Sequence, residues 1–240
     1  MLSAHYLSNI LFLDIETVPQ YPSYDELPEN WKYLWGKKGE QLLRNREGET
    51  IETVYSRAGI YAEFGKIICI SCGIVTGYGE GKKLSLKSFS GKDEKQLLQD
   101  FSEMLTRWAT DDYKLLCAHN GKEFDFPYIS RRMIINGLMI PPLLNMAGKK
   151  PWEIKHLDTM ELWKFGDYKS FTSLELLAHI LNIPTPKDDI DGSKVFEVYW
   201  KDEDLSRIVE YCQKDVRTLA QVFLRLNVES PVKEENIDIK

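Results

Sequence analysis

Four carboxylates in three separate segments are the side chains of this sequence best suited to chemistry. Asp14 and Glu16 follow an apolar run, Asp125 lies near the middle of the chain, and Asp215 lies close to its end. Mg²⁺ and Mn²⁺ are hard cations that prefer oxygen ligands, so four carboxylates could hold a pair of them. Two such ions are suited to the attack of water on a phosphodiester. The sequence therefore predicts a metal-dependent nuclease.

The spacing within two of these segments places the candidate groups on common faces. Asp14 and Glu16 are two residues apart, which on a strand puts both side chains on the same side. Tyr211 and Asp215 are four residues apart, the spacing of neighbours on a helix face. A tyrosine with a pKa near 10 is expected to orient water rather than to act as a strong base. Each motif alone has an ordinary explanation, such as a helix cap at Asp125, and their combination carries the prediction.

The elements that must position these residues follow from apolar periodicity. Strands are predicted at 10–13, 66–76, 83–90, 114–118 and 154–157. Helices are predicted at 93–109, 126–136, 159–164, 173–181 and 202–227. The first strand would deliver Asp14 and Glu16 at its end. This order predicts an α/β fold in which a mixed five-stranded sheet carries helices on both faces.

The domain prediction is a single unit over residues 1–229, with an insertion at about 21–64 and a mobile tail at 230–240. The insertion is helical and rich in aromatic residues. Its Trp31, Tyr33 and Trp35 could stack on single-stranded bases, or could fill a core or a lid. Cys69 and Cys72 lie in a predicted strand, on opposite faces, and are expected to be small buried hydrophobes.

Composition narrows the function classes. The net charge is −6 and the pI is about 5.4, which disfavours a bulk electrostatic binder of nucleic acid. An enzyme that grips only a few nucleotides needs only local lysines and arginines. No apolar run approaches the roughly 20 residues of a membrane span. The N-terminus shows no secretory pattern, so we expect a cytoplasmic protein without a membrane partner.

The three motifs together resemble those of the DEDD superfamily of 3′–5′ exonucleases, Tyr subgroup, which have the ribonuclease-H-like (DnaQ-like) fold. The motifs are Asp14-Ile15-Glu16-Thr17, Asn120 through Asp125, and Tyr211 through Asp215. The resemblance runs from about residue 11 to 226. It is closest to stand-alone bacterial relatives of the proofreading domain of family-B DNA polymerases. We expect no polymerase module after the third motif, so that any proofreading would be in trans.

The resemblance implies a role for each motif residue. Asp14 would bridge two divalent ions, Mg²⁺ or Mn²⁺, with Glu16 and Asp215 completing one metal site and Asp125 serving the other. Tyr211 and Glu16 would position the attacking water. Nucleoside 5′-monophosphates would leave one at a time from the 3′ end of single-stranded DNA. The other subgroup of the superfamily has histidine in place of Tyr211, so His119 is not expected to be that catalytic histidine.

Several further side chains are candidates for contact with the substrate. Thr17, Asn120 and Phe124 match motif positions, and the last two of these line the substrate cleft in relatives. Lys122, Lys187 and Arg131 could reach phosphates, although surface cations are more often simply solvated. His119 is either a structural histidine or a substrate contact, and Asp158 is expected to be structural.

Two alternatives stay open at this point. One is an exoribonuclease of the same fold, because discrimination of DNA from RNA depends on contacts to the 2′-hydroxyl that no motif reports. The other is a nucleic-acid-binding module without turnover, against which the complete set of carboxylates weighs. The expected partner is a single-stranded 3′ end, DNA rather than RNA, and the sequence does not identify a replication or repair partner.

Overall fold

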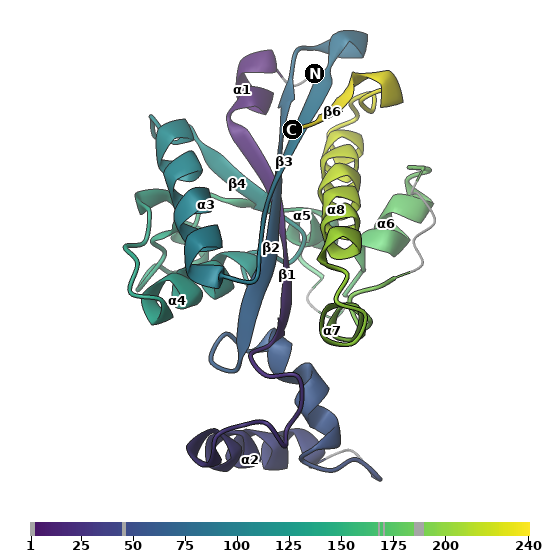
Figure 1. Cartoon of the computed structure of the whole chain (residues 1–240). Helices are drawn as coiled ribbons and strands as arrows, with labels where there is room; N and C mark the ends of the chain where they lie inside the picture. The colour runs from purple at the N-terminus through teal and green to yellow at the C-terminus, as the bar shows by residue number, and fades with distance from the viewer. Residues whose placement is uncertain (1–2, 45–46, 168, 170, 185–189) are drawn as a thin grey trace.

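A single mixed sheet forms the centre of the protein (Figure 1). The computed structural model describes residues 3–44, 47–167, 169, 171–184 and 190–240. The strand order is β5-β4-β1-β2-β3-β6, with β2 antiparallel to both of its neighbours and the other pairs parallel. The strands are β1 (Ile10–Pro19), β2 (Gly65–Thr76), β3 (Lys83–Ser90), β4 (Leu115–Ala118), β5 (Leu157–Asp158) and β6 (Ile237–Ile239).

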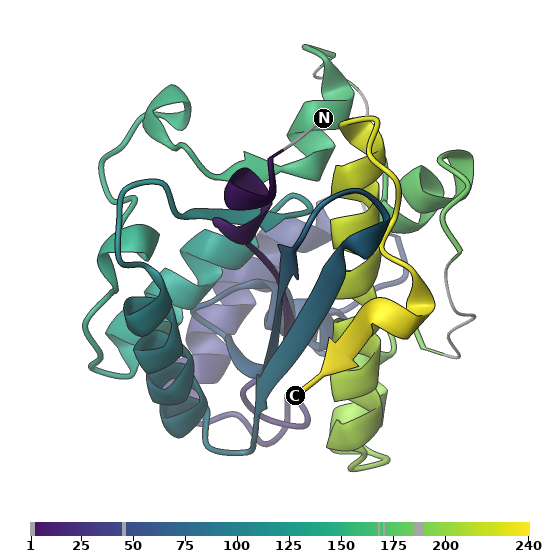
Figure 2. The ribbon, with the colours of Figure 1, turned by 90° about the horizontal axis from the view of Figure 1, so that it is seen from above.

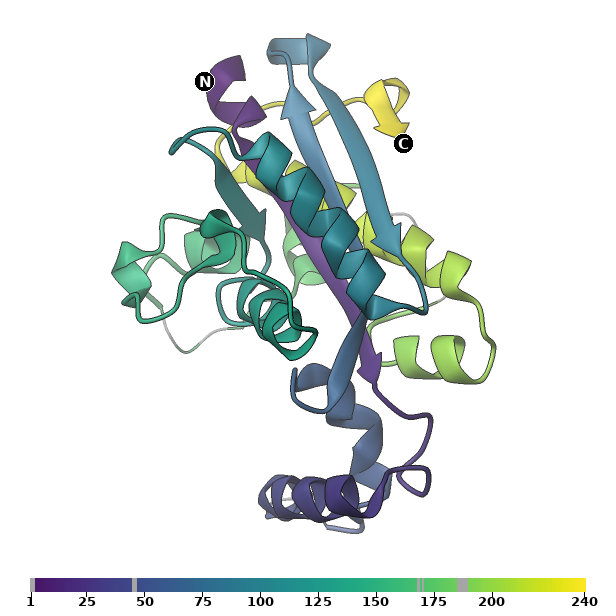
Figure 3. The same cartoon turned by 60° about the vertical axis from the view of Figure 1, so that its left-hand side comes forward.

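Helices cover both faces of this sheet. The α-helices are α1 (Ala4–Ser8), α2 (Glu29–Leu43), α3 (Glu94–Trp108), α4 (Asp125–Ile135), α5 (Thr159–Lys164), α6 (Leu174–Ile180), α7 (Val195–Trp200) and α8 (Leu205–Leu226). Short 3₁₀ helices are η1 (Thr53–Ile60), η2 (Gly79–Gly81), η3 (Pro142–Leu144), η4 (Pro151–Glu153) and η5 (Glu234–Asn236). Helices α3 and α4 pack on one face, and α7 and α8 on the other (Figures 1 and 3). The predicted fold class is thereby confirmed.

None of the helices formed by the described residues combines the length and the apolar composition needed to cross a membrane.

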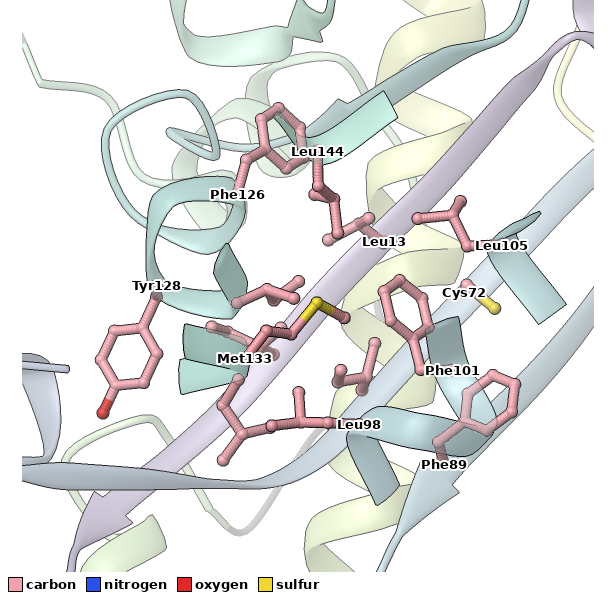
Figure 4. Packing of buried hydrophobic residues seen from close by; sticks show 14 of the residues in the cluster. Leu13, Cys72, Phe89, Leu98, Phe101, Leu105, Phe126, Tyr128, Met133 and Leu144 are labelled. Carbon is pink, nitrogen blue, oxygen red and sulfur yellow. The ribbon is translucent and has the colours of Figure 1, made fainter. Parts of the chain in front are cut away.

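Alternation along β1 divides the core into two layers. Leu11, Leu13 and Ile15 face the cluster formed with α3 and α4, of which Figure 4 shows the packing. Within this cluster Leu98 and Phe101 of α3 are fully buried. Burying a side chain of this size contributes about 1.5–3 kcal/mol, so this layer fixes α3 on the sheet. The intervening residues of β1 face α8 and α7 instead.

The first strand is longer than predicted. It continues to Pro19, so Asp14 and Glu16 lie within the strand rather than at its end. The cause is that β2 pairs with β1 along nearly its whole length, from Leu11 to Pro19. The parallel partner β4 pairs only as far as Phe12. Beyond that residue β1 has β2 on one edge only.

Among the described residues the sheet has six strands rather than the predicted five, because the end of the chain adds one. Figure 2 shows the C-terminal strand β6 beside β3, with which it pairs in parallel. The segment leading to it is held by Gln221 of α8, whose amide exchanges two hydrogen bonds of 2.8 Å with the backbone of Val232. The tail predicted to be mobile is therefore packed. Strand β5 is also shorter than predicted, and α7 was not predicted.

The insertion has a small core of its own, beyond the end of β1 (Figure 1). Trp35 is fully buried there, and its Nε1 donates to the carbonyl oxygen of Ile51 at 3.0 Å. Its ring meets that of Tyr55 edge to face, with centroids 5.5 Å apart. Trp35 therefore fills a core. Tyr33, by contrast, is 63% exposed, and Trp31 is partly buried at the edge of the same cluster, so stacking on a base stays a prediction for these two residues.

Candidate active site

Strand β1 has a polar stretch between two apolar ones on the face that looks toward α8. Phe12 packs in the cluster with α8, and Val18 packs in the cluster with α7. Asp14 and Glu16 lie between them with the same two-residue periodicity, and therefore on the same face. Glu16 is only 7% exposed. The strand thus places two carboxylates at a junction between apolar clusters.

Helix α8 repeats this pattern in helical spacing. Ile208 packs in the cluster with α7, and Val216 packs in the cluster with Phe12. Tyr211 and Asp215 lie between these two residues on α8. A Cβ atom at Gly73 of β2 would lie 3.2 Å from the Val216 side chain, so the glycine permits the close approach of α8 to the sheet. The polar stretch of the helix therefore meets the polar stretch of β1.

Asp125 reaches the same place from the other side of the strand. It is the first residue of α4, and its carboxylate accepts a hydrogen bond from the backbone N–H of Ile15. That N–H is available because β4 pairs with β1 only as far as Phe12. Burial raises the pKa of Asp125 to about 7. The open edge of β1 thus admits a third segment to the site.

The cluster is electrostatically costly without a counter-charge. Burial raises the pKa of Asp14 well above its usual range, and the neighbouring carboxylates of Glu16, Asp125 and Asp215 raise it further. The pKa of Glu16 is raised by burial and by Asp215 in the same way. Buried carboxylates in contact must take up protons or bind cations. Four oxygen donors under this constraint fit hard divalent cations.

Tyr211 points its hydroxyl into this cluster. Burial raises the pKa of Tyr211 far above its usual value, and the charges of Asp215, Glu16 and Asp14 raise it further. The hydroxyl is therefore protonated at physiological pH and donates a hydrogen bond to Asp215. This state suits the orientation of a water molecule and does not suit removal of its proton. The structure therefore brings all five candidate catalytic side chains together.

A bulge next to Glu16 adjusts the direction of the strand pair. Glu16 pairs with Cys69, but the next residue, Thr17, pairs with Ile67, so Ile68 of β2 has no opposite residue. Such bulges re-aim side chains and are frequent beside active sites. Thr17 is half-buried and hydrogen-bonds the hydroxyl of Tyr128, a neighbour that the sequence did not suggest.

The loop that delivers Asp125 is organised by Asp158. The carboxylate of Asp158 accepts hydrogen bonds from the backbone N–H groups of Asn120 at 2.9 Å and Lys122 at 3.2 Å. It also caps α5 through Met160 N–H at 3.0 Å. Asn120 adopts a left-handed conformation with φ 62°, which asparagine tolerates well. Asp158 thus has a structural role, in agreement with the prediction.

The candidate substrate contacts differ in their exposure and in whether other side chains already engage them. Phe124 is half-buried, with its ring centroid 5.3 Å from that of Tyr128. The ammonium group of Lys122 is engaged by Glu161 at 2.7 Å. Arg131 is exposed on α4. Lys187 lies outside the described residues. The contacts of Thr17, Asn120, Phe124 and Lys122 with a substrate stay predictions.

His119 is satisfied by structural partners. Its Nε2 lies 2.9 Å from the carbonyl oxygen of Thr172, and its Nδ1 lies 2.9 Å from the hydroxyl of Thr159. A carbonyl can only accept, so Nε2 carries the proton and Nδ1 accepts from the hydroxyl. Burial lowers the pKa of His119, which favours this neutral form. The structural alternative is therefore the better description of this residue.

Sequence reasoning missed Cys212 as a member of the site. Its sulfur and the carboxylate oxygens of Asp14 and Glu16 all lie within 4.8 Å of one another. A signal was available, because Cys212 and Asp215 are three residues apart on one helix and so share a face. The expected burial of Cys69 and Cys72 is observed, and Cys72 packs in the cluster on the α3 side.

Comparison with known proteins identifies the family. Residues 60–237 match the model of a family described as predicted 3′–5′ exonucleases related to the exonuclease domain of PolB. The chain belongs to this family and is a nuclease of the 3′–5′ exonuclease class. The matched region contains Asp125 and the Tyr211–Asp215 motif, whereas Asp14 and Glu16 precede it. The placement of these two residues in the site comes from the structure alone.

Solved structures with a similar arrangement include a polymerase and a ribonuclease. The family B DNA polymerase from the hyperthermophilic archaeon Pyrobaculum calidifontis is 15% identical, with a TM-score of 0.46 over 92% of this chain and 26% of its own. The RNase domain of the yeast Pop2 protein is 12% identical, with a TM-score of 0.41 over 96% of this chain and 81% of its own. The chain thus spans about a quarter of the polymerase it matches.

Proposed function

We propose that this exonuclease removes nucleotides one at a time from the 3′ end of single-stranded DNA, with two divalent cations held by Asp14, Glu16, Asp125 and Asp215. The observation that carries the proposal is the cluster of these carboxylates, gathered from β1, α4 and α8, in which Glu16 and Asp125 are buried and Asp14 and Asp215 are half-buried. A fold retains so unfavourable a cluster when the cations that offset its charge are needed for function.

The electrostatic interactions among the carboxylates support different metal-binding roles for them. Asp14 interacts electrostatically with each of the other three, which supports its role as the ligand shared by both cations. Asp215 is the carboxylate with the largest effect on Glu16, in support of a common site for that pair. When bound, Mg²⁺ or Mn²⁺ would lower the pKa of the attacking water and offset the charge on the phosphate.

Glu16 and Tyr211 are proposed to hold the attacking water in line with the scissile bond. The protonated hydroxyl of Tyr211 is a donor, and the carboxylate of Glu16 is an acceptor, so together they can fix both the position and the orientation of the water. The water oxygen bonds to phosphorus as the bond to the preceding 3′ oxygen breaks. That oxygen takes a proton to become the new 3′-hydroxyl, and a nucleoside 5′-monophosphate is released.

The substrate would approach along the loop after β4. Asn120, Phe124 and Lys122 lie on this loop, and Thr17 lies beside Tyr128, against which the Phe124 ring packs. An aromatic ring at the edge of a site offers a stacking surface that tolerates any base. Lys122 would contact a phosphate only after leaving Glu161, so we expect its contribution to be small.

The test is degradation of a 5′-labelled single-stranded DNA and of an RNA of the same sequence, with Mg²⁺ or Mn²⁺ and with EDTA as control. Asp14→Asn is compared with Asp112→Asn, which makes the same change at an exposed position in the loop between α3 and β4. We expect a metal-dependent ladder that shortens from the 3′ end, lost in the first variant and kept in the second.

Two results would count against the proposal. Wild-type turnover by Asp14→Asn would overturn the assignment of the site. Faster degradation of the RNA than of the DNA would overturn the choice of substrate and leave the exonuclease activity standing.

A further inference from the structure

The thiol of Cys212 is in direct contact with Asp14. Its Sγ atom lies 3.4 Å from Asp14 Oδ2 and 3.5 Å from the backbone oxygen of the same residue. Cys212 is fully buried. When a bound cation keeps Asp14 ionised, its carboxylate can only accept hydrogen bonds, so the thiol is then the donor. One carboxylate oxygen of Asp14 is therefore held from α8, while the rest of the residue is fixed by β1.

A continuous series of polar side chains lies behind this thiol. The thiol of Cys212 interacts with the thiol of Cys69 on β2. The Sγ atom of Cys69 lies 3.7 Å from the hydroxyl of Ser71. Ser71 is 2.8 Å from the hydroxyl of Ser88 on β3. The series ends at Gln213, whose Nε2 donates to Ser88 at 2.9 Å. The series thus leaves α8 at Cys212, crosses β2 and β3, and returns to α8 at the next residue, Gln213.

The direction of these hydrogen bonds is set by the two ends of the series. The amide nitrogen of Gln213 can only donate, and the carboxylate of Asp14, once a bound cation keeps it ionised, can only accept. Every hydroxyl and thiol between them can therefore point its hydrogen toward Asp14. Hydrogen bonds aligned in this way polarise one another and strengthen each member of the chain. The donor that reaches Asp14 is thus backed by the groups behind it.

Position and burial distinguish this series from ordinary core packing. Cys69, Ser71 and Cys212 are fully buried, between the apolar cluster around Phe12 and the one around Val18. A hydroxyl in such a place costs free energy unless it is hydrogen-bonded, and an apolar side chain would fill the space without that requirement. The series leads from this interior to one particular carboxylate oxygen.

We propose that this chain of hydrogen bonds positions the Asp14 carboxylate for cation binding, with Cys212 as the positioning residue that makes the final contact. The inference rests on the proposed function of the site. Partners behind a metal ligand orient it, and their loss commonly weakens metal affinity by about 10–100-fold. A thiol is a weak donor, so the expected loss lies at the lower end, about tenfold.

The experiment is a titration of the full chain with Mn²⁺, followed by the electron paramagnetic resonance signal of the free ion. This readout does not depend on turnover. Cys212→Ala removes the donor, and Cys212→Ser keeps one. Cys117→Ala is the control, because it removes an equally buried thiol from the apolar cluster around Phe12. Thermal unfolding in EDTA shows that each variant is folded.

The expected result is a dissociation constant about tenfold higher for Cys212→Ala, near the wild-type value for Cys117→Ala, and within about threefold of the wild type for Cys212→Ser. Ser71→Ala should weaken binding in the same direction and by less, because it interrupts the chain two links away. Wild-type affinity in Cys212→Ala, or equal weakness of the alanine and serine variants, would overturn the proposal.

The outcome is separable from that of the proposed function. A wild-type protein that binds Mn²⁺ but degrades neither DNA nor RNA would overturn the function, while the affinities of the variants would still decide the role of Cys212. Degradation at the wild-type rate with an unchanged affinity in Cys212→Ala would leave the function standing and overturn the role of Cys212.

Discussion

Glu94 and Asp14 show two opposite treatments of a carboxylate inside this protein. Glu94, at the start of α3, is 8% exposed and accepts hydrogen bonds from Arg132 Nε at 2.8 Å, Asn136 Nδ2 at 3.0 Å and Ile67 N–H at 2.7 Å. Arg132 also donates to the carbonyl oxygen of Ala62 at 2.8 Å, which ties the end of the insertion to α3 and α4. Asp14 instead has other carboxylates as its charged neighbours, which raise its pKa.

The difference teaches which of the two clusters serves the fold. A buried charge with a bidentate partner and satisfied hydrogen bonds holds segments together, and removal of one partner is strongly destabilising. A buried set of like charges lowers the stability of the metal-free protein and is retained because the site needs it. Glu94 and Asp14 should therefore respond to substitution in opposite ways.

The largest expected effect is the loss of activity in Asp14→Asn. Loss of a ligand removes several kcal/mol of transition-state stabilisation, about a thousandfold in rate. The metal-free variant should be at least as stable as the wild type, because a source of repulsion is gone. Steady-state kinetics and thermal unfolding in EDTA check the two parts. A clear drop in the unfolding temperature would show that Asp14 supports the fold as Glu94 does.

Glu94→Ala should show the reverse pattern. The guanidinium of Arg132 would be left buried without its counter-charge, at a cost of about 3–5 kcal/mol in the free energy of unfolding. Urea denaturation measures this loss. The double variant Glu94→Leu with Arg132→Met should recover most of the stability, since it removes both charges. A loss below about 1 kcal/mol, typical of a surface pair, would contradict this reading of the ion pair.

Tyr211→Phe should separate catalysis from metal binding within the site. The variant keeps the ring and loses the donor, so we expect a rate about a hundredfold lower with a nearly unchanged Mn²⁺ affinity. Single-turnover kinetics and the Mn²⁺ titration check these expectations. A parallel loss of rate and affinity would indicate that the hydroxyl acts through Asp215, to which it donates.

The smallest expected effect is a pH dependence of the metal-free stability. The pKa of Asp125 is raised to about 7 in the folded state, above its ordinary value near 4. Between these values the folded protein binds more protons than the unfolded chain, so stability falls as pH rises through this window. Thermal unfolding in EDTA at pH 5 and pH 7.5 should show the lower midpoint at pH 7.5. Asp125→Asn should flatten the slope, and a midpoint that rises with pH would contradict the assignment.

Local pattern predicted most of the elements but not the limits that matter for the site. The apolar run over 66–76 and the alternation over 83–90 matched β2 and β3 closely, because a glycine-rich turn separates the two segments. The end of β1 was misplaced because Asp14 and Glu16 look like a strand terminus when their buried surroundings are unknown. The packing of Val232 against Gln221 depends on a distant helix, so the order of the tail was not visible in its polar composition.

The candidate site was predictable as a list and not as an arrangement. The carboxylates and Tyr211 stand out by type and spacing, and the family match covers three of these five residues. The contacts of Cys212 with Asp14 and of Asp158 with the loop after β4 join segments far apart in the sequence. A thiol and a carboxylate have many ordinary roles, so only their placement in the fold distinguishes these residues.

The pairing of β6 with β3 has a consequence for how molecules of this protein behave toward one another. A bare strand at the side of a sheet is a template for the backbone of another chain, and proteins avoid aggregation by covering it. Here β6 pairs with Leu84–Leu86, and the N–H of Lys240 donates to the carbonyl oxygen of Leu86 at 2.9 Å. A version shortened to Glu229 would expose that strand and gain a tendency to self-associate. Strand β6 thus protects the edge of β3 from pairing with another copy of the protein.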